Sequence, residues 1–277
     1  MKTQAHKAAE FRALHERDGA FIVPNPWDAG SAKLLAALGF EALATTSLGL
    51  ACTLGRPDGA GAVTRREVLD NCAAIASATD LPVSADLENC YAREPRAAAE
   101  MIRLAAEAGV VGGSIEDSSG DARDPIYGFE LAVERVHAAV EAARSLGFPF
   151  VLTARAENFF LGRRDLDDTI RRLQAFEKAG ADVLYAPGLR DLDTIRTVAR
   201  AVTKPLNVVV GMLEPGISAA DLAQAGVKRI SVGGALCRLA LRHMMDGARE
   251  MRERGTFGWM AQVPPYAEMS SIFGRKD

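Results

Sequence analysis

Two acidic residues stand two positions apart in the stretch SADLENC, residues 84–90. The stretch follows a proline and lies among apolar residues, so it is typical of a strand. Side chains two positions apart in a strand point to the same face, which places Asp86 and Glu88 together. The apolar run GGSIED ends in two more acids, Glu116 and Asp117. Carboxylates that converge in this way repel one another unless one takes up a proton or a cation neutralises them.

Magnesium is the cation that best matches these residues, with manganese as a substitute. Mg²⁺ binds a few carboxylates and waters in octahedral geometry and leaves positions for substrate oxygens. Zinc would require clustered His and Cys, whereas the four histidines lie in expected helices or in the N-terminal segment. We therefore expect Asp86, Glu88 and Glu116 to form a metal site.

Further strand ends supply groups that suit an anion. The stretch TARAEN carries Arg155 and Glu157, and the planar guanidinium of Arg155 matches a carboxylate or a phosphonate. Another run ends in Ser47 and Gly49, and a third contains Asn207. A metal, an arginine and backbone amides at a glycine turn together predict a site for a small, multiply charged anion.

Several of these residues also have simple structural interpretations. Asp58 and Asp117, each taken alone, are more simply explained as helix caps. Glu157 fits a structural ion pair with Arg155 equally well. The three acids assigned to the metal cannot all be caps without crowding, so for them the metal interpretation is favoured.

Eight strand-like runs separated by helical stretches would position these residues. In five of them a helical stretch ends at glycine and an apolar run follows, which is typical of a strand buried on both faces. The runs lie within residues 21–26, 37–47, 81–88, 107–117, 145–155, 178–188, 204–211 and 224–234. Eight such units in ~230 residues predict an α/β protein with the (β/α)8 fold of a TIM barrel, whose chemistry lies at the C-terminal ends of the strands. A doubly wound sheet is the alternative, although it more often has fewer strands.

The helix starts carry recognisable capping residues. Thr64 and Glu67 form the pattern of a capping box, Pro95 suits a first helical position, and Asp28 is most simply a helix cap. No linker divides the chain, so residues 1–277 are expected to form one domain. Its last residues, 256–277, are rich in large apolar side chains and are expected to be a docking tail.

The composition limits the possible partners. The 277 residues are 48% hydrophobic and 25% charged, with a formal net charge of −3 and no basic stripe, so nucleic acid is not an expected partner. The apolar runs fall short of the ~20 residues that a membrane span needs. The four cysteines form no CxxC pair and suit a reducing compartment. A cytoplasmic protein with no membrane partner is expected.

Five stretches together resemble the isocitrate lyase/phosphoenolpyruvate mutase superfamily. They are PWDAGSA, TTSLGLA with the following LGRPDG, SADLENCY, GSIEDSSG and TARAEN. The resemblance implies a barrel that binds Mg²⁺, to which an α-oxo or α-hydroxy carboxylate chelates. By position, Asp86 resembles the direct metal ligand. Asp58, Glu88 and Glu116 resemble the acids that hold the metal through water. Arg155 resembles the arginine that binds substrate.

The same resemblance implies a cradle and an assembly. Ser47 and the backbone amides of Leu48 and Gly49 resemble the cradle for the substrate carboxylate, and we add Asn207 to the expected substrate-binding residues. Members of the superfamily typically form tetramers in which a C-terminal helix is exchanged between barrels. A homotetramer with an exchanged C-terminal extension is therefore expected here.

Two departures from the superfamily pattern bear on the reaction. The loop after the fourth strand, EDSSGDARDPIYGFE, lacks the cysteine that serves the lyases as acid–base catalyst and the Lys and Asn of the mutases. In the motif DxDxGYG, this chain has Glu88, Cys90 and Ala92 in place of Asp, Gly and Gly. The loop disfavours isocitrate cleavage and phosphonopyruvate rearrangement, whereas the substitutions in the motif are expected to narrow the mouth beside the metal and alter the favoured substrate.

Decarboxylation remains because carbon dioxide leaves without a proton from the enzyme. We expect a Mg²⁺-dependent carbon–carbon lyase that acts on a small 2-oxo or 2-hydroxy dicarboxylate, such as an oxaloacetate decarboxylase, with Asp58, Glu116 and Arg155 as its catalytic residues. One alternative is a mutase or hydrolase of a phosphonopyruvate-type carbon–phosphorus bond. An alternative from another class is a barrel that binds a carboxylate without catalysis.

Overall fold

Eight parallel strands form a nearly closed barrel in the computed structural model, which describes residues 2–59 and 61–274. The strand order is β1-β8-β7-β6-β5-β4-β3-β2. The Ala44 N–H, on the last strand of this order, donates to the carbonyl of Pro24, just beyond the first, at 3.1 Å. The strands are β1 (Phe21–Val23), β2 (Leu43–Ala44), β3 (Val83–Ala85), β4 (Gly112–Glu116), β5 (Val151–Arg155), β6 (Val183–Tyr185), β7 (Leu206–Val209) and β8 (Arg229–Ser231).

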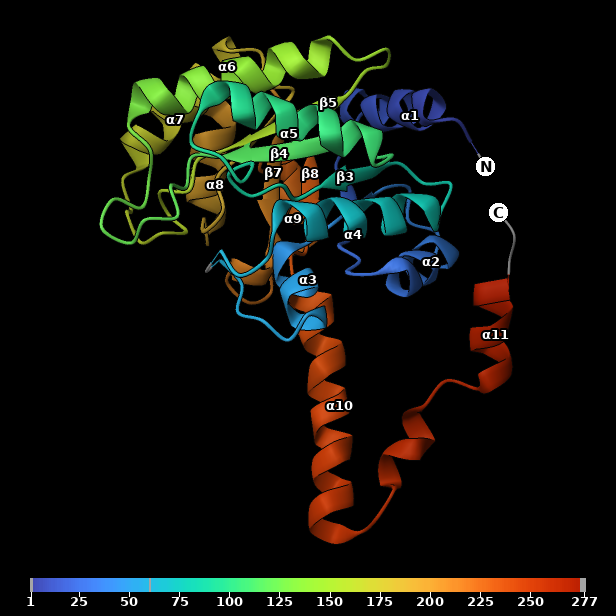
Figure 1. Ribbon diagram of the computed structural model, residues 1–277. Coiled ribbons are helices and arrows are strands. Elements are labelled where there is room, and N and C mark those ends of the chain that lie inside the picture. The colour runs from blue at the N-terminus through green and yellow to red at the C-terminus, as the bar shows by residue number, and fades with distance from the viewer. Residues whose placement is uncertain (1, 60, 275–277) are drawn as a thin grey trace.

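Helices alternate with the strands and cover the outside of the barrel (Figure 1). The fold is thus the predicted (β/α)8 TIM barrel, and each predicted strand run contains one observed strand. The helices before the C-terminal extension are α1 (Gln4–Glu16), α2 (Ala29–Ala37), α3 (Ser47–Thr53), α4 (Arg65–Ser77), α5 (Pro95–Glu107), α6 (Phe129–Arg144), α7 (Leu166–Lys178), α8 (Leu192–Ala201), the 3₁₀ turn η1 (Val210–Met212) and α9 (Ala219–Gln224).

The predicted helix starts are confirmed in detail. The Thr64 hydroxyl accepts the N–H of Glu67, whose carboxylate accepts the N–H of Thr64, so the capping box is complete. Asp28 caps α2 by the same reciprocal pattern, and Pro95 is the first residue of α5. Local sequence therefore sets where these helices begin.

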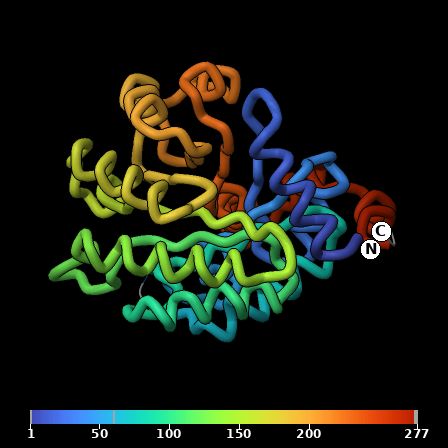
Figure 2. Tube along the Cα trace, turned by 90° about the horizontal axis from the view of Figure 1, so that it is seen from above, coloured from blue at the N-terminus to red at the C-terminus, as the bar shows by residue number. Residues whose placement is uncertain are grey.

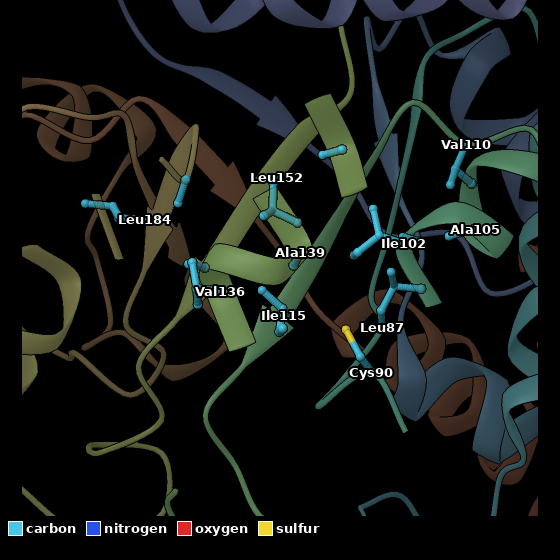
Figure 3. Packing of buried hydrophobic residues seen from close by; sticks show 14 of the residues in the cluster. Leu87, Cys90, Ile102, Ala105, Val110, Ile115, Val136, Ala139, Leu152 and Leu184 are labelled. Carbon is cyan, nitrogen blue, oxygen red and sulfur yellow. The ribbon is translucent and has the colours of Figure 1, made fainter. Parts of the chain in front are cut away.

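A continuous apolar layer joins the helices to the outer face of the barrel. Figure 3 shows Ile115 of β4 and Leu152 of β5 among side chains of α5 and α6 that include Ile102, Val136 and Ala139. All five residues are at most 3% exposed. This packing fixes the strands, and with them the residues at the strand ends.

The end of the barrel opposite the strand C-termini is closed by α1. Phe11 and Leu14 of this helix form a buried cluster with Phe21, Val151 and Val183 at the beginnings of strands. Seen along the direction of Figure 2, the chain winds once around the barrel from blue to orange. With one end plugged, access to the barrel interior is left to the C-terminal ends of the strands.

A C-terminal extension leaves the barrel after β8. It consists of α10 (Ala235–Arg254), the 3₁₀ turn η2 (Gly258–Gln262) and α11 (Tyr266–Gly274). Figure 1 shows α10 projecting from the barrel and α11 returning beside α2, where Lys33 Nζ donates to the carbonyl of Phe273 at 3.3 Å. Within the single chain α11 thus packs on its own α2, and exchange of this extension between subunits stays a prediction. No helix in the described part of the chain is both long and apolar enough to span a membrane.

Candidate active site

Charged residues gather at the C-terminal ends of β3, β4 and β5. Glu116 is the last residue of β4 and lies opposite Arg155, the last residue of β5, which in turn lies opposite Tyr185 of β6. Asp86 follows β3 directly. Because neighbouring parallel strands end at the same rim, side chains far apart in sequence meet here.

Arg155 is the centre of this cluster. Its Nη1 donates to Asp86 Oδ1 at 2.9 Å, its Nη2 lies 3.1 Å from Glu116 Oε2, and its Nε donates to Glu157 Oε1 at 2.8 Å. The Arg155 side chain is 13% exposed and that of Glu157 is 1% exposed. Glu157 therefore forms the ion pair that its sequence position suggested, within a larger network in which three carboxylates share one arginine.

The carboxylates are crowded beyond what one arginine can neutralise. Burial raises the pKa of Glu116 well above its usual value, in spite of the opposing effect of Arg155, and nearby carboxylates raise it further. Burial also raises the pKa of Glu157. Burial alone would lower the pKa of Arg155, yet the surrounding acids raise it well above its ordinary range. This rim therefore attracts a further cation or a proton.

Two more predicted residues lie next to the cluster. Burial raises the pKa of Asp58, the charge of Asp86 adds to the rise, and a hydrogen bond from Ser47 opposes it. Burial likewise raises the pKa of Glu88 to about 6, and the hydroxyl of Tyr91 donates to Glu88 Oε1. Both acids feel the charge of Asp86, so the structure brings Asp58, Glu88 and Glu116 around it.

The strand-based reason for placing Asp86 and Glu88 together was wrong. β3 ends at Ala85, so both acids lie in the turn that follows. Glu88 has φ 47°, Cys90 59° and Tyr91 54°, a left-handed conformation that is uncommon outside glycine. The two acids approach each other because the turn is tightly bent, not because they alternate along a strand.

Arg135 of α6 holds this bent turn in place. Its Nη2 donates to the carbonyl of Asn89 at 2.6 Å, and its Nη1 donates to the carbonyls of Ala92 and Arg93. The Arg135 guanidinium also lies over the ring of Tyr127, 4.5 Å from its centroid. A strained backbone persists when its surroundings fix it in this way, and such strain is concentrated at functional sites.

The predicted carboxylate cradle is the N-terminus of α3. The Ser47 N–H donates to Asp86 Oδ2 at 3.1 Å, and the Gly49 N–H donates to the capping hydroxyl of Thr46 at 3.4 Å. A Cβ at Gly49 would lie 2.6 Å from the Cβ of Trp27. Glycine is therefore required here by close packing, and the Ser47 amide is directed at the acidic cluster.

Asn207 faces the barrel interior. Its Oδ1 accepts from Arg229 Nε at 2.8 Å, and its Nδ2 donates to Ser231 Oγ at 3.1 Å. It lines a cavity that Asp86 and Arg155 also line, so it borders the cluster from inside. Its expected contact with substrate remains a prediction.

Asp117 is a structural residue, but it is not a helix cap as its sequence position suggested. It is 2% exposed, and its carboxylate accepts the Glu157 N–H at 2.8 Å and Arg172 Nη1 at 3.0 Å. Its carbonyl accepts the N–H of Tyr127. Asp117 thus anchors both ends of the loop 118–127 and the segment that carries Glu157. A partner 55 residues away could not be read from local sequence.

Three contributors to the site were missed from sequence. Thr45 Oγ1 accepts the N–H of Asp86 at 2.9 Å, Tyr91 binds Glu88, and the ring of Tyr185 lies 5.1 Å from the Arg155 guanidinium. Tyr185 could have been identified from the sequence, because it is the last residue of β6 just as Arg155 is the last residue of β5. Tyr91 lies three positions after Glu88 in the sequence, whereas Thr45 shows no signal beyond its place near a strand end.

The acids fit a hard divalent cation by type, although they do not enclose one in this arrangement. Within residues 2–59 and 61–274, no three His, Cys, Asp or Glu side chains are placed so as to hold a metal ion. The guanidinium of Arg155 and the amide of Ser47 bind the oxygens of Asp86 instead. Carboxylate oxygens are nevertheless the ligands that Mg²⁺ prefers, and a bound cation would favour the ionised forms of Asp58, Glu88 and Glu116, whose pKa values burial raises.

Comparison with known proteins matches this chain to one family. The sequence model of phosphoenolpyruvate phosphomutase matches residues 11–252. A structure from Burkholderia cenocepacia, described as a lyase/mutase, is 56% identical with a TM-score of 0.96, and the match covers 99% of this chain and 98% of that one. A 2,3-dimethylmalate lyase of the PEP mutase/isocitrate lyase superfamily is 26% identical with a TM-score of 0.86, covering 99% and 96%. The oxaloacetate decarboxylase of Ectopseudomonas mendocina is 28% identical over 248 residues, which are 87% of this chain and 83% of that protein.

Proposed function

We propose a function for this chain from the premise that it belongs to the phosphoenolpyruvate phosphomutase family, within the PEP mutase/isocitrate lyase superfamily. Its homologues include lyases of that superfamily. The proposed activity is that of a Mg²⁺-dependent carbon–carbon lyase that decarboxylates a small 2-oxo dicarboxylate, of which oxaloacetate is the simplest. The observation that carries the proposal is the cluster of carboxylates around Arg155 at the strand ends.

Asp86, Glu88 and Glu116 would hold the metal, and Asp58 would hold one of its waters. Mn²⁺ has the same preference for oxygen ligands and would substitute. When bound, the cation supplies Lewis-acid stabilisation of the negative charge that develops on the 2-oxo group. The closeness of these acids supports the assignment, because the charge of Asp86 contributes to the raised pKa values of Asp58, Glu88 and Glu116, and a bound cation would offset that repulsion.

The substrate carboxylates would be bound by protein groups next to the metal. Arg155 presents a planar fork of N–H donors, and Ser47 with the amides of Leu48 and Gly49 forms the start of α3 beside Asp86. Arg155 already pairs with three acids, so a bound substrate would compete for its N–H groups. Asn207 would border the substrate from the barrel interior.

The loop 118–127 has the form of a short lid rather than a source of protons. Ser118 and Ile126 form an antiparallel bridge across it, and the Ser119 N–H donates to the carbonyl of Pro125 at 2.9 Å. The loop contains no Cys, Lys or His to act as a general acid. Decarboxylation needs no such group for the departure of carbon dioxide, which favours it over cleavage of an isocitrate-type substrate.

Formation of pyruvate from oxaloacetate tests the proposal. We expect a rate with Mg²⁺ that exceeds the free-metal background, falls to that background with EDTA, and is lost in Asp86→Asn. A matched control is Asp70→Asn, which alters an exposed acid on α4. Equal rates with Mg²⁺ and with EDTA, or a rate that Asp86→Asn leaves unchanged, would rule out the proposed reaction.

Carbon–phosphorus chemistry is the second candidate, and the family match to phosphoenolpyruvate phosphomutase favours it. The same metal and arginine would bind phosphonopyruvate, whose phosphonate resembles a second carboxylate. Phosphorus NMR of an incubation with phosphonopyruvate separates the two, because either rearrangement or release of phosphate moves the resonance. A barrel that binds a carboxylate without catalysis would show neither activity, yet oxalate and Mg²⁺ would still raise its Tm.

The C-terminal extension is the proposed contact for assembly into a homotetramer. Its exposed apolar side chains include Met244, Phe257 and Tyr266, which are 64%, 62% and 88% exposed. Such a concentration of apolar surface on a projecting arm is typical of a surface that another subunit covers. Sedimentation of the full chain and of a chain ending at residue 255 would show whether assembly needs the extension.

A further inference from the structure

Arg229 is a buried arginine without an acidic partner. It is the first residue of β8, is 6% exposed, and points into the barrel with Asn207. Its Nε donates to Asn207 Oδ1 at 2.8 Å and its Nη2 to Thr153 Oγ1 at 2.9 Å. Both acceptors are neutral oxygens, and among the described residues no carboxylate pairs with its guanidinium.

One nitrogen of Arg229 has no partner at all in the described structure. Nη1 is fully buried and donates no hydrogen bond. Burial lowers the pKa of Arg229 only to about 10, so the side chain remains a cation at neutral pH. Burying an unpaired charge and leaving its donors unused are both costly, and natural proteins seldom do so without compensation.

Other arginines with little exposure show how such compensation is normally achieved. Arg155 and Arg172 each contact at least two carboxylates. Arg135 lacks an acid and its Nε also has no hydrogen-bond partner, but its two other nitrogens donate to three backbone carbonyls and its guanidinium lies over the ring of Tyr127. Arg229 has neither kind of surroundings, so its environment is incomplete without a further group.

A cavity adjoins Arg229. Its volume is about 70 Å³, well above the roughly 10–15 Å³ that a single water requires. The interior of such a barrel is normally filled by branched apolar side chains. Here the side chains that line the cavity include the hydroxyl groups of Ser84, Ser114 and Ser231 and the amide of Asn207.

We propose that this cavity binds a small monovalent anion, of the size of chloride or formate, with Arg229 as its cationic ligand. The anion would accept hydrogen bonds from Arg229 and from the hydroxyls of the neighbouring serines. It would also supply the single negative charge that balances the guanidinium. The cavity also reaches Asp86 and Arg155 at the rim. A free inorganic anion and a carboxylate of an active-site ligand therefore share the chemistry that this site recognises.

Anomalous diffraction from crystals of the full chain soaked in sodium bromide tests the proposal directly. We expect a bromide peak in contact with Arg229 in the wild-type protein and none in Arg229→Met. If oxalate with Mg²⁺ displaces this bromide, the anion is the carboxylate of an active-site ligand. If bromide persists, the anion is inorganic and independent of the substrate. A water molecule alone beside Arg229, with bromide only on the outer surface, would overturn the proposal.

A solution measurement complements the crystals and is separate from catalysis. At constant ionic strength, replacing gluconate with chloride should raise the Tm of the wild type by on the order of 2–4 °C when chloride is at about five times its dissociation constant. Arg229→Met should lose this dependence, and Arg238→Met, an exposed arginine of α10, should retain it. The same chloride dependence in wild type and Arg229→Met would contradict a site at Arg229. Should Arg229→Met fail to fold, Arg229→Lys keeps the charge, and the wild-type bromide result still decides.

Discussion

Replacement of Arg155 with glutamine removes the only guanidinium that neutralises Asp86, Glu116 and Glu157 in the described network. Each of these carboxylates lies within 3.1 Å of one of its nitrogens. Removing one partner of a buried ion pair typically costs about 3–5 kcal/mol, because the remaining charge is left uncompensated. The three contacts share one cation, so their contributions do not add, and we expect Arg155→Gln to lower the free energy of unfolding by about 3–5 kcal/mol at pH 7 without metal.

The loss should depend on pH in a defined direction. Burial already holds the pKa of Glu116 and of Glu157 above the unfolded value, and loss of Arg155 removes the charge that opposes this rise. At pH values between the unfolded pKa of these glutamates and their raised folded pKa, the folded variant then binds more protons than the unfolded variant. Its stability must therefore increase as the pH falls from 7 towards the unfolded glutamate pKa of about 4.3.

Urea denaturation followed by circular dichroism, in EDTA, measures both effects. Arg66→Gln is the matched control, because Arg66 forms a single exposed ion pair with Asp70 and its loss should change the urea midpoint little. Added Mg²⁺ should restore part of the stability of Arg155→Gln, since a divalent cation would replace the missing charge. A variant as stable as the wild type at pH 7, or one whose loss is the same at pH 5, would refute the electrostatic reasoning.

Three further changes test separate parts of the structure. Glu88→Gln in EDTA should raise the urea midpoint at pH 7, because burial raises the pKa of Glu88 to about 6 and so disfavours its ionised form in the fold. The difference in midpoint from the wild type should shrink towards pH 4, and a difference that stays constant would argue against the raised pKa of Glu88. Gly49→Ala should cost about 1–3 kcal/mol and weaken oxalate binding measured by calorimetry, because its Cβ would lie 2.6 Å from that of Trp27; unchanged stability would show that α3 can move freely. Thr64→Ala should cost about 1 kcal/mol through loss of the cap on α4 while leaving oxalate affinity unchanged, and a change in that affinity would contradict the assignment of Thr64 to the helix alone.

Local patterns in the sequence were sufficient for the architecture. The glycine that ends a helix before an apolar run marks five of the eight strand-like runs, and caps such as Thr64 mark helix starts, because both depend on residues a few positions apart. Eight strand-like runs separated by helical stretches predict a closed parallel barrel. The strand ends then bring Asp86, Glu116 and Arg155 to one rim.

The details of the site depend on contacts between distant residues. The turn after β3 is bent by left-handed residues and fixed by Arg135, which lies 47 positions after Glu88 in the sequence. Asp117 pairs with Arg172 and not with its own helix, a pairing that no local pattern reports. The isolation of Arg229 is likewise visible only when the interior of the whole barrel is assembled.

A crystal structure of the full chain with Mn²⁺ and oxalate is the most direct test of the central claim that a divalent cation completes the acidic rim. We expect an anomalous manganese peak coordinated by Asp86, with Glu88, Glu116 and Asp58 around it and oxalate bound to the metal beside Arg155. Oxalate bound at Arg155 without metal, or manganese bound only at surface carboxylates, would contradict the account.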